Sequence, residues 1–120
     1  NEDLFIDLVD WEWCWRARSK GYKIFIDKRL TIMHMLGRGH KNFLFFKIGV
    51  PDPIRHYYQY RNSIILSRLN YVPVKWKLSR FIIHIFKLVF FLFYDQRLIR
   101  LKYAIKGIKD GLFNKTGKLI

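Results

Sequence analysis

Residues 10–21, DWEWCWRARSKG, and the YKIFI that follows at residues 22–26 carry the strongest local signals for the fold. Acidic residues open the first stretch, basic residues close it and a glycine follows, an order that stabilises and then ends an α-helix. We therefore expect a helix over residues 10–20 with Asp10 as its N-cap. The alternating, β-rich residues 22–26 predict a strand, and residues 30–34 predict a second one.

Helical patterns dominate the later part of the chain. Asp52-Pro53 is typical of an N-cap followed by the first helical residue and predicts a helix to about Asn70. Residues 76–94 are very apolar apart from one narrow polar stripe at helical spacing. Its members are Lys77, Arg80, His84 and Lys87. Residues 97–112 repeat Leu and Ile three and four apart among bases, which predicts a basic amphipathic helix.

These last two helices are expected to lie in a membrane surface rather than to cross it. The segment from Arg80 to Tyr94 makes roughly 22 Å of helix, whereas a bilayer core is about 30 Å thick. Long basic side chains can keep their charges among the headgroups while an aromatic face, here taken to include Phe90 and Phe91, enters the acyl boundary.

The charge of the chain is divided unevenly. Residues 1–27 hold six of the nine acids against four bases, whereas residues 28–120 hold three acids and nineteen bases, within a net charge of +14. Such a basic region indicates an anionic partner, either a membrane or a nucleic acid. A single cysteine, Cys14, excludes an internal disulfide framework and a zinc site built from several cysteines. The abrupt start, without an initiator methionine, leads us to expect part of a longer chain.

Several short motifs follow one another along the sequence. They are Phe5-Ile6-Asp7, Val9-Asp10-Trp11-Glu12-Trp13, Arg16-Ala17-Arg18, Gly21-Tyr22, His34-Met35-Leu36-Gly37, Arg55-His56-Tyr57-Tyr58-Gln59-Tyr60-Arg61-Asn62 and Gly107-Ile108-Lys109-Asp110-Gly111. In this order they resemble the C-terminal signature of the family 2 glycosyltransferases, and most nearly that of the bacterial rhamnosyltransferase subgroup. The resemblance implies an α/β fold, the C-terminal portion of a GT-A domain, followed by an amphipathic helical tail. We place the catalytic portion at residues 1–72 and the membrane-associated tail at residues 73–120.

The resemblance also implies roles for individual residues. Asp10 matches the general base, and Trp11 and Glu12 would contribute to the substrate site. His34 matches a histidine that helps to hold a divalent cation, Mg²⁺ or Mn²⁺, in the full-length enzyme. Its alternative is an ordinary hydrogen-bonded histidine at a strand end. The nucleotide-sugar site and its Asp-x-Asp motif would lie upstream, so this chain alone is expected to be inactive.

Less specific interpretations apply to many of these side chains. Acids at a helix start are also typical of capping, and Glu12 can pair with Arg16 four residues later. Aromatic residues at helical spacing are usually core, which is the expectation for Trp13 and Trp15. Tyr57, Tyr58 and Arg61 are expected to serve packing and surface more often than ligand binding, and Asp7 has no assigned role.

The sequence therefore predicts part of an inverting glycosyltransferase that transfers a sugar from a nucleotide diphosphate to a hydroxyl of a lipid-linked glycan. The subgroup points to rhamnose, and the basic tail to a peripheral position on the cytoplasmic face of the bacterial inner membrane. A non-catalytic membrane-binding module is the alternative. A nucleic-acid-binding module fits the charge but neither the acidic helix nor the apolar segment at residues 81–94, so no nucleic-acid partner is expected.

Overall fold

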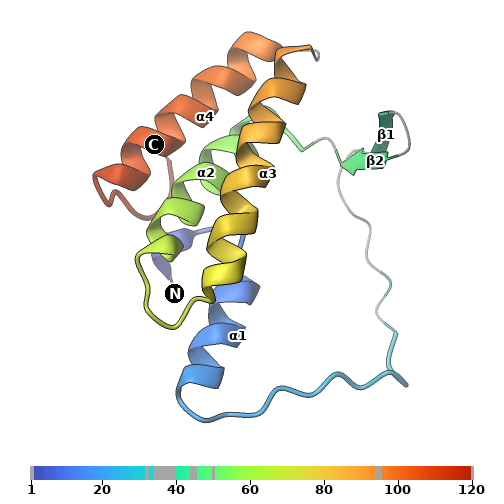
Figure 1. Ribbon diagram of the computed structural model, residues 1–120, viewed down its shortest axis with the longest axis vertical. Helices are drawn as coiled ribbons and strands as arrows, with labels where there is room; N and C mark the ends of the chain where they lie inside the picture. The colour runs from blue at the N-terminus through green and yellow to red at the C-terminus, as the bar shows by residue number, and fades with distance from the viewer. Residues whose placement is uncertain are drawn as a thin grey trace.

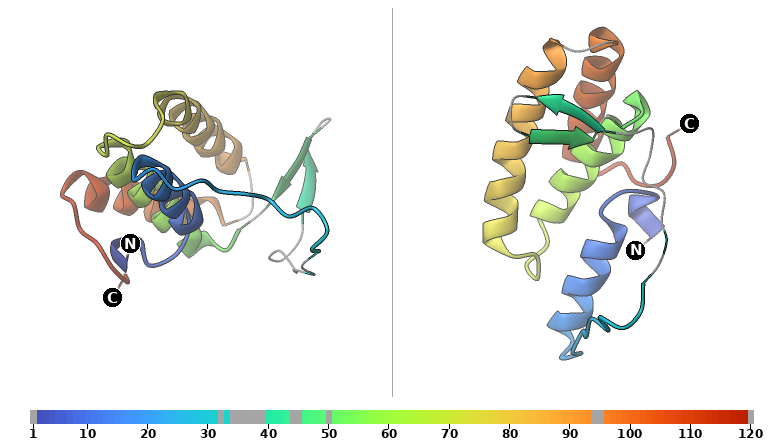
Figure 2. Two further views of the ribbon diagram at one scale, coloured as in Figure 1. Left: turned by 90° about the horizontal axis from the view of Figure 1, so that it is seen from below. Right: turned by 90° about the vertical axis from the view of Figure 1, so that its right-hand side faces the viewer.

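The computed structural model describes residues 2–31, 33, 40–43, 46–49, 51–93 and 96–119 of the chain. In chain order the elements are the 3-10 helix η1 (Glu2–Leu4), helix α1 (Val9–Ser19), strands β1 (His40–Phe43) and β2 (Phe46–Gly49), and helices α2 (Pro53–Ser67), α3 (Val74–Leu92) and α4 (Arg97–Leu112). The helices form the packed body, with α3 and α4 against α2 and α1 at one end (Figure 1). The strand pair stands apart from them (Figure 2).

The expected α/β fold is wrong: the packed body is all-helical in the part of the chain that the structure describes. Its two short strands pair only with each other, antiparallel, with His40 opposite Gly49. Residues 22–26, predicted as a strand, are irregular and exposed, and Phe25 is 83% exposed. The described residues of the second predicted strand, 30, 31 and 33, are not in a strand either. Alternation alone does not make a strand, because strands are stabilised by cross-strand neighbours and a covered face.

The predicted helices all form, with corrections at their ends. Asp10 does not cap α1; Leu8 is the N-cap, and Asp10 lies in the first turn. At the other end Gly21 has φ +85° and its N–H bonds to the Arg18 carbonyl oxygen at 3.0 Å, so it ends the helix as expected. Asp52 is the N-cap of α2, which stops at Ser67 rather than near residue 70.

The core joins the N-terminal segment to the helix pair α2 and α3. Its buried apolar members are Leu4, Ile65, Leu66, Val72 and Trp76. Helix α4 packs on α2 through small residues: a Cβ at Gly107 would meet the backbone of Tyr57, and one at Gly111 would meet the Arg61 backbone. The Leu and Ile side chains that recur three and four apart along α4 are therefore not all buried in this contact. Leu98 and Ile105, for example, are exposed.

Helix α3 is turned the opposite way from the expected membrane-surface helix. Its polar stripe faces the other helices: Lys77 Nζ donates to the Leu69 carbonyl oxygen at 2.9 Å, and Lys87 Nζ to Gln59 Oε1 at 3.1 Å. Phe90 and Phe91, predicted to face lipid, are buried instead. Across the described residues, none of the helices combines the length and apolar character needed to span a bilayer. The division at residues 72 and 73 falls in the turn between α2 and α3 and stays a prediction.

Candidate functional site

The segment that leads into α1 has an unusual backbone. Phe5, Asp7 and Leu8 have φ angles of 61°, 62° and 68°, in the left-handed region that residues other than glycine seldom adopt. Each such residue costs on the order of 1 kcal/mol or more and persists only where its surroundings hold it. This segment sets the direction of α1 and therefore the position of Asp10.

Arg61 on α2 is one of the groups that hold this segment. Its guanidinium is fully buried and donates from Nη2 to the carbonyl oxygens of Leu4 at 2.9 Å and Asp3 at 3.2 Å. Nη1 donates to the Gly117 carbonyl oxygen at 2.6 Å, so one side chain joins α2 to both ends of the described chain. The rings of Tyr57 and Tyr58 flank the same guanidinium. The packing role expected for these three residues is confirmed, whereas the expected surface position is wrong because all three are buried.

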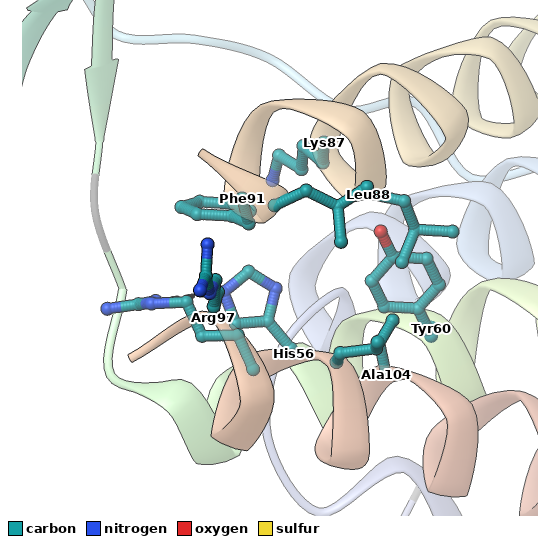
Figure 3. A pocket seen from close by; sticks show the side chains of 10 residues that line it. His56, Tyr60, Lys87, Leu88, Phe91, Arg97 and Ala104 are labelled. Carbon is teal, nitrogen blue, oxygen red and sulfur yellow. Dashed lines mark hydrogen bonds between the residues drawn. The ribbon is translucent and has the colours of Figure 1, made fainter. Parts of the chain in front are cut away.

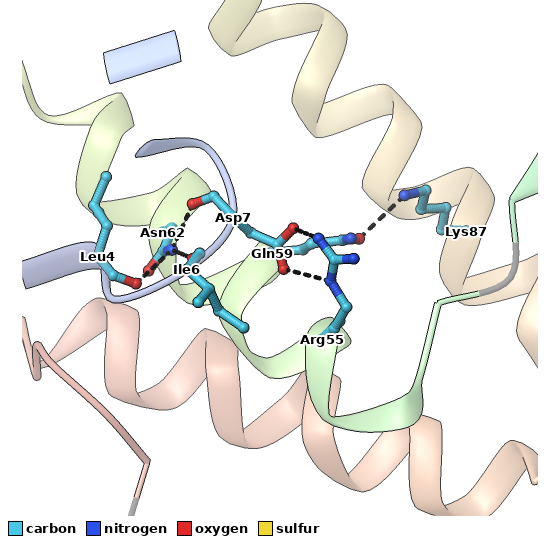
Figure 4. Close-up of polar contacts among 7 residues, drawn as sticks. All are labelled: Leu4, Ile6, Asp7, Arg55, Gln59, Asn62 and Lys87. Carbon is cyan, nitrogen blue, oxygen red and sulfur yellow. Dashed lines mark hydrogen bonds and ion pairs between the residues drawn. The ribbon is translucent and has the colours of Figure 1, made fainter. Parts of the chain in front are cut away.

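Asn62 holds the same segment from the next position. Its Nδ2 lies 3.0 Å from the Leu4 carbonyl oxygen, 2.7 Å from that of Ile6 and 2.9 Å from that of Asp7 (Figure 4). An amide nitrogen carries two hydrogens, so three acceptors share them. One buried side chain thus contacts three carbonyl oxygens of this segment, and Leu4 has further donors in Arg61 and the Ile6 N–H.

A third tether is ionic. Arg55, in the first turn of α2, donates to both carboxylate oxygens of Asp7, from Nε at 3.1 Å and from Nη2 (Figure 4). A bidentate guanidinium–carboxylate pair fixes orientation as well as distance. Asp7, to which the sequence assigned no role, is therefore a structural partner of Arg55.

Asp10 is presented by this scaffold. Its side chain is exposed on the first turn of α1, and no side chain in the described part of the chain pairs with it. Trp11, beside it, is 50% exposed. The covered part of that indole packs on Trp76 at 6.5 Å between ring centroids, and the Arg80 guanidinium lies over it at 5.7 Å. The first turn of α1 thus carries both an exposed carboxylate and a half-exposed indole.

Glu12 is held inside rather than presented. It is fully buried, and its Oε1 accepts hydrogen bonds from Arg16 Nε at 2.9 Å and from the Tyr71 hydroxyl at 2.7 Å. Burial and the bond to Glu12 raise the pKa of Tyr71 to about 12, so Tyr71 remains a donor at neutral pH. The pairing with Arg16 that the sequence allowed is confirmed. Glu12 links α1 to the α2–α3 turn, and its contribution to a substrate site stays a prediction.

The four tryptophans divide between core and surface. Trp15 packs edge-on against Trp76 at 4.8 Å and borders the buried cluster, as expected. Trp13 is exposed, so its expected core position is wrong. The reason is its place on α1: the helix contacts the body through Glu12 and Trp15, and Trp13 lies on the other side.

A small pocket among α2, α3 and α4 lies away from Asp10. His56, Tyr60, Lys87, Leu88, Phe91 and Ala104 are among its lining residues (Figure 3). Arg100 Nη1 lies 3.0 Å from His56 Nε2, which must accept this bond, and burial with the charges of Arg100 and Lys87 lowers the pKa of His56 to about 4. The pocket is therefore a packed junction between three helices whose histidine is neutral.

The described residues do not by themselves supply a metal site. Among them, no three His, Cys, Asp or Glu side chains gather closely enough to hold an ion. The predicted metal ligand His34 lies outside the described residues. What this part of the chain presents at the start of α1 is thus the single carboxylate of Asp10 rather than a chelating set.

Comparison with known proteins bears on the motifs that lead to this site. The chain is 29% identical over 118 residues to the dTDP-rhamnosyl transferase RfbF of Shigella flexneri. It is thus distantly related to a glycosyltransferase. The alignment covers 98% of this chain but 40% of that protein, so this chain spans less than half of the relative's length. No family model and no solved structure matches the chain. The relation predicted from the motifs is confirmed at this level.

Proposed function

We propose that this chain is the acceptor-side part of an inverting glycosyltransferase, with Asp10 as its general base. The observation that carries the proposal is the exposed Asp10 carboxylate in the first turn of α1, directly after a left-handed segment that three separate side chains hold. The alignment with a rhamnosyl transferase over nearly the whole chain supports the reaction class. Strained backbone that is held this firmly is more often found at functional sites than elsewhere.

The reaction assigns one task to Asp10. The acceptor hydroxyl oxygen forms a bond to the anomeric carbon while the bond from that carbon to the diphosphate breaks, and the nucleoside diphosphate leaves with the electron pair. The Asp10 carboxylate takes the hydroxyl proton as the new bond forms, from the face opposite the leaving group. Trp11 would provide an apolar surface for the sugar ring of the acceptor.

The remaining participants follow from the resemblance and are part of the proposal. The donor is a nucleotide-diphosphate sugar, with rhamnose as the candidate sugar, and its site lies in residues beyond this chain. The acceptor is a lipid-linked glycan at the cytoplasmic face of the inner membrane. A divalent cation, Mg²⁺ or Mn²⁺, would require His34 together with ligands from elsewhere and would neutralise charge on the diphosphate.

The test is the Asp10→Asn substitution in the complete enzyme, assayed against a panel of nucleotide sugars with a lipid-linked acceptor. The amide keeps the shape of the side chain but cannot accept the proton, so kcat should fall by about a hundredfold or more while donor affinity is unchanged. Asp27→Asn is the matched control, because it makes the same change at an exposed carboxylate outside α1 that pairs with Arg29 and should leave turnover unchanged. Near wild-type turnover in Asp10→Asn would exclude the assignment.

A second function has its own support. The outward face of α3 is apolar, which fits a membrane-binding module whether or not the chain catalyses a reaction. The same transfer assay separates the two: a complete protein that binds vesicles but transfers no sugar from any donor in the panel would favour the non-catalytic module.

A further inference from the structure

The polarity of helix α3 is inverted relative to a helix on the surface of a water-soluble body. From Arg80 to Phe93 its only polar side chains are Arg80, His84 and Lys87, and all three turn toward the other helices. Arg80 lies over the ring of Trp11 on α1 at 5.7 Å, and His84 Nε2 is 2.7 Å from Ser63 Oγ on α2. These groups take up the space that apolar side chains of an amphipathic helix normally fill.

The opposite face of α3 is apolar and open. Its exposed members include Leu78, Phe81, Ile82, Ile85, Phe86 and Val89. They recur three and four apart, so they form one continuous surface along the helix, which lies on the outside of the body (Figure 2). An exposed apolar surface of this continuity marks an interaction site.

We propose that this face of α3 binds the surface of an anionic lipid bilayer, with the helix lying parallel to the membrane. The inference deepens the proposed function, which requires access to a lipid-linked acceptor. Two observations favour a bilayer over a protein partner. The first is that the outward face from residue 81 to residue 93 offers no hydrogen-bonding side chain, whereas protein interfaces carry about one hydrogen bond per 100–200 Å².

The second observation is charge. Exposed cations bracket the apolar face along the chain, with Lys75 in the first turn of α3 and Arg97 at the start of α4. Lys75 begins the row that continues through Leu78, Ile82 and Phe86, so a base leads directly into the apolar surface. The chain as a whole carries +14, the complement of anionic phospholipid headgroups. Helices with this division insert their apolar face to the level of the headgroup and acyl boundary.

The experiment measures vesicle binding and, separately, which face enters the lipid. Ile82→Gln combined with Phe86→Gln removes two side chains from the outward face without touching the buried stripe. Leu98→Gln combined with Ile105→Gln is the matched control, since both residues are exposed on α4. Binding is followed by sedimentation of the 120-residue chain with phosphatidylcholine vesicles that contain increasing fractions of phosphatidylglycerol. Circular dichroism and thermal melting establish that each variant is folded.

We expect the α3 pair to lower partitioning by about a hundredfold, because each of the two side chains contributes about tenfold or more when fully buried. The α4 pair should change it by less than about threefold. Equal losses in both variants, or no partitioning of the unaltered chain, would overturn the inference. Binding should also weaken as salt rises, because screening acts on headgroup contacts within about 10 Å.

A fluorescent label reports the face directly. In a Cys14→Ser background, an environment-sensitive label is attached through Ile82→Cys or, as control, Ile105→Cys. Emission at residue 82 should shift to the blue only when anionic vesicles are added. A shift at residue 82 without vesicles that depends on protein concentration would identify a second copy of the chain as the occupant and overturn the inference. Blue-shifted emission from the label at residue 82 of the complete protein, before lipid is added, would also overturn the inference. It would show that another part of that protein covers the α3 face. A negative result in these lipid experiments does not change the loss of turnover expected for Asp10→Asn. The membrane inference and the proposed catalytic function can therefore be refuted independently.

Discussion

Replacing Asn62 with leucine tests whether the left-handed segment before α1 is held in the way described. Leucine has a similar volume but no donor, so the carbonyl oxygens of Leu4, Ile6 and Asp7 lose the Nδ2 contact. Leu4 keeps the bond from Arg61 and that from the Ile6 N–H. The carbonyls of Ile6 and Asp7 depend on Asn62 among the described contacts. Two acceptors left without a partner cost about 1–3 kcal/mol each, so we expect a loss of about 2–6 kcal/mol in the free energy of unfolding.

The assay is urea unfolding of the variant, with hydrogen exchange of the α1 amides as the local measure. The loss is large against a total of about 5–15 kcal/mol for a typical domain, and α1 amides should lose protection before those of α4. Ser67→Ala is the control, because it removes an exposed side-chain hydrogen bond to the backbone of the same helix and should cost under about 0.5 kcal/mol. An Asn62→Leu variant as stable as Ser67→Ala, with α1 protected, would refute the reasoning.

Two further predictions concern the helix pair α2 and α4 and the buried histidines. Gly107→Ala should destabilise the chain by about 1–3 kcal/mol in thermal unfolding, because the added methyl meets the Tyr57 backbone, which cannot move aside as a side chain could. Gly21→Ala is the comparison variant: its methyl would meet open space, so it measures only the backbone strain at φ +85°. Burial and nearby cations lower the pKa of His56 to about 4 and of His84 to about 3, so below pH 6.5 the unfolded chain binds protons that the folded chain does not. Stability should therefore fall by about 2 kcal/mol per histidine between pH 7 and pH 5, and His84→Gln should reduce that loss by about half in urea titrations at the two pH values.

The helices are predictable because their signals are local. Gly21 ends α1 and Asp52-Pro53 begins α2 through contacts within one or two turns, so the surrounding fold does not alter them. The strand predicted at residues 22–26 depends instead on neighbours that are distant in sequence. The described residues place none beside it, and its alternating side chains stay exposed. Sequence periodicity records which face would be buried, but not whether anything is there to bury it.

The candidate site shows the same division. A motif singles out Asp10, and its exposure on α1 fits the expected role without testing it. The residues of the motif RHYYQYRN are expected mainly to pack, but their contacts also position the backbone that precedes Asp10. Arg55, Arg61 and Asn62 fix the backbone that places Asp10, across sequence separations of about fifty residues or more. The sequence signal for this role is the pair Arg61 and Asn62 on a helix that is otherwise expected to be buried. Such polar groups are seldom buried unless they have several hydrogen-bond partners.

The spacing of the polar residues on α3 correctly predicts that they share one face of the helix. The expectation that this face points to lipid headgroups is wrong, because it points to the other helices. Spacing identifies which residues share a face, but the direction of that face depends on what the helix meets. Here α2 offers polar partners, Gln59 and Ser63, to Lys87 and His84, so the stripe is satisfied inside. Once those partners are taken, the apolar side has only the exterior left to face. An inside-out helix of this kind is stable in water only at a cost, since its largest apolar side chains stay hydrated. That cost is removed where the exterior is itself apolar, as it is for a helix lying in a membrane surface.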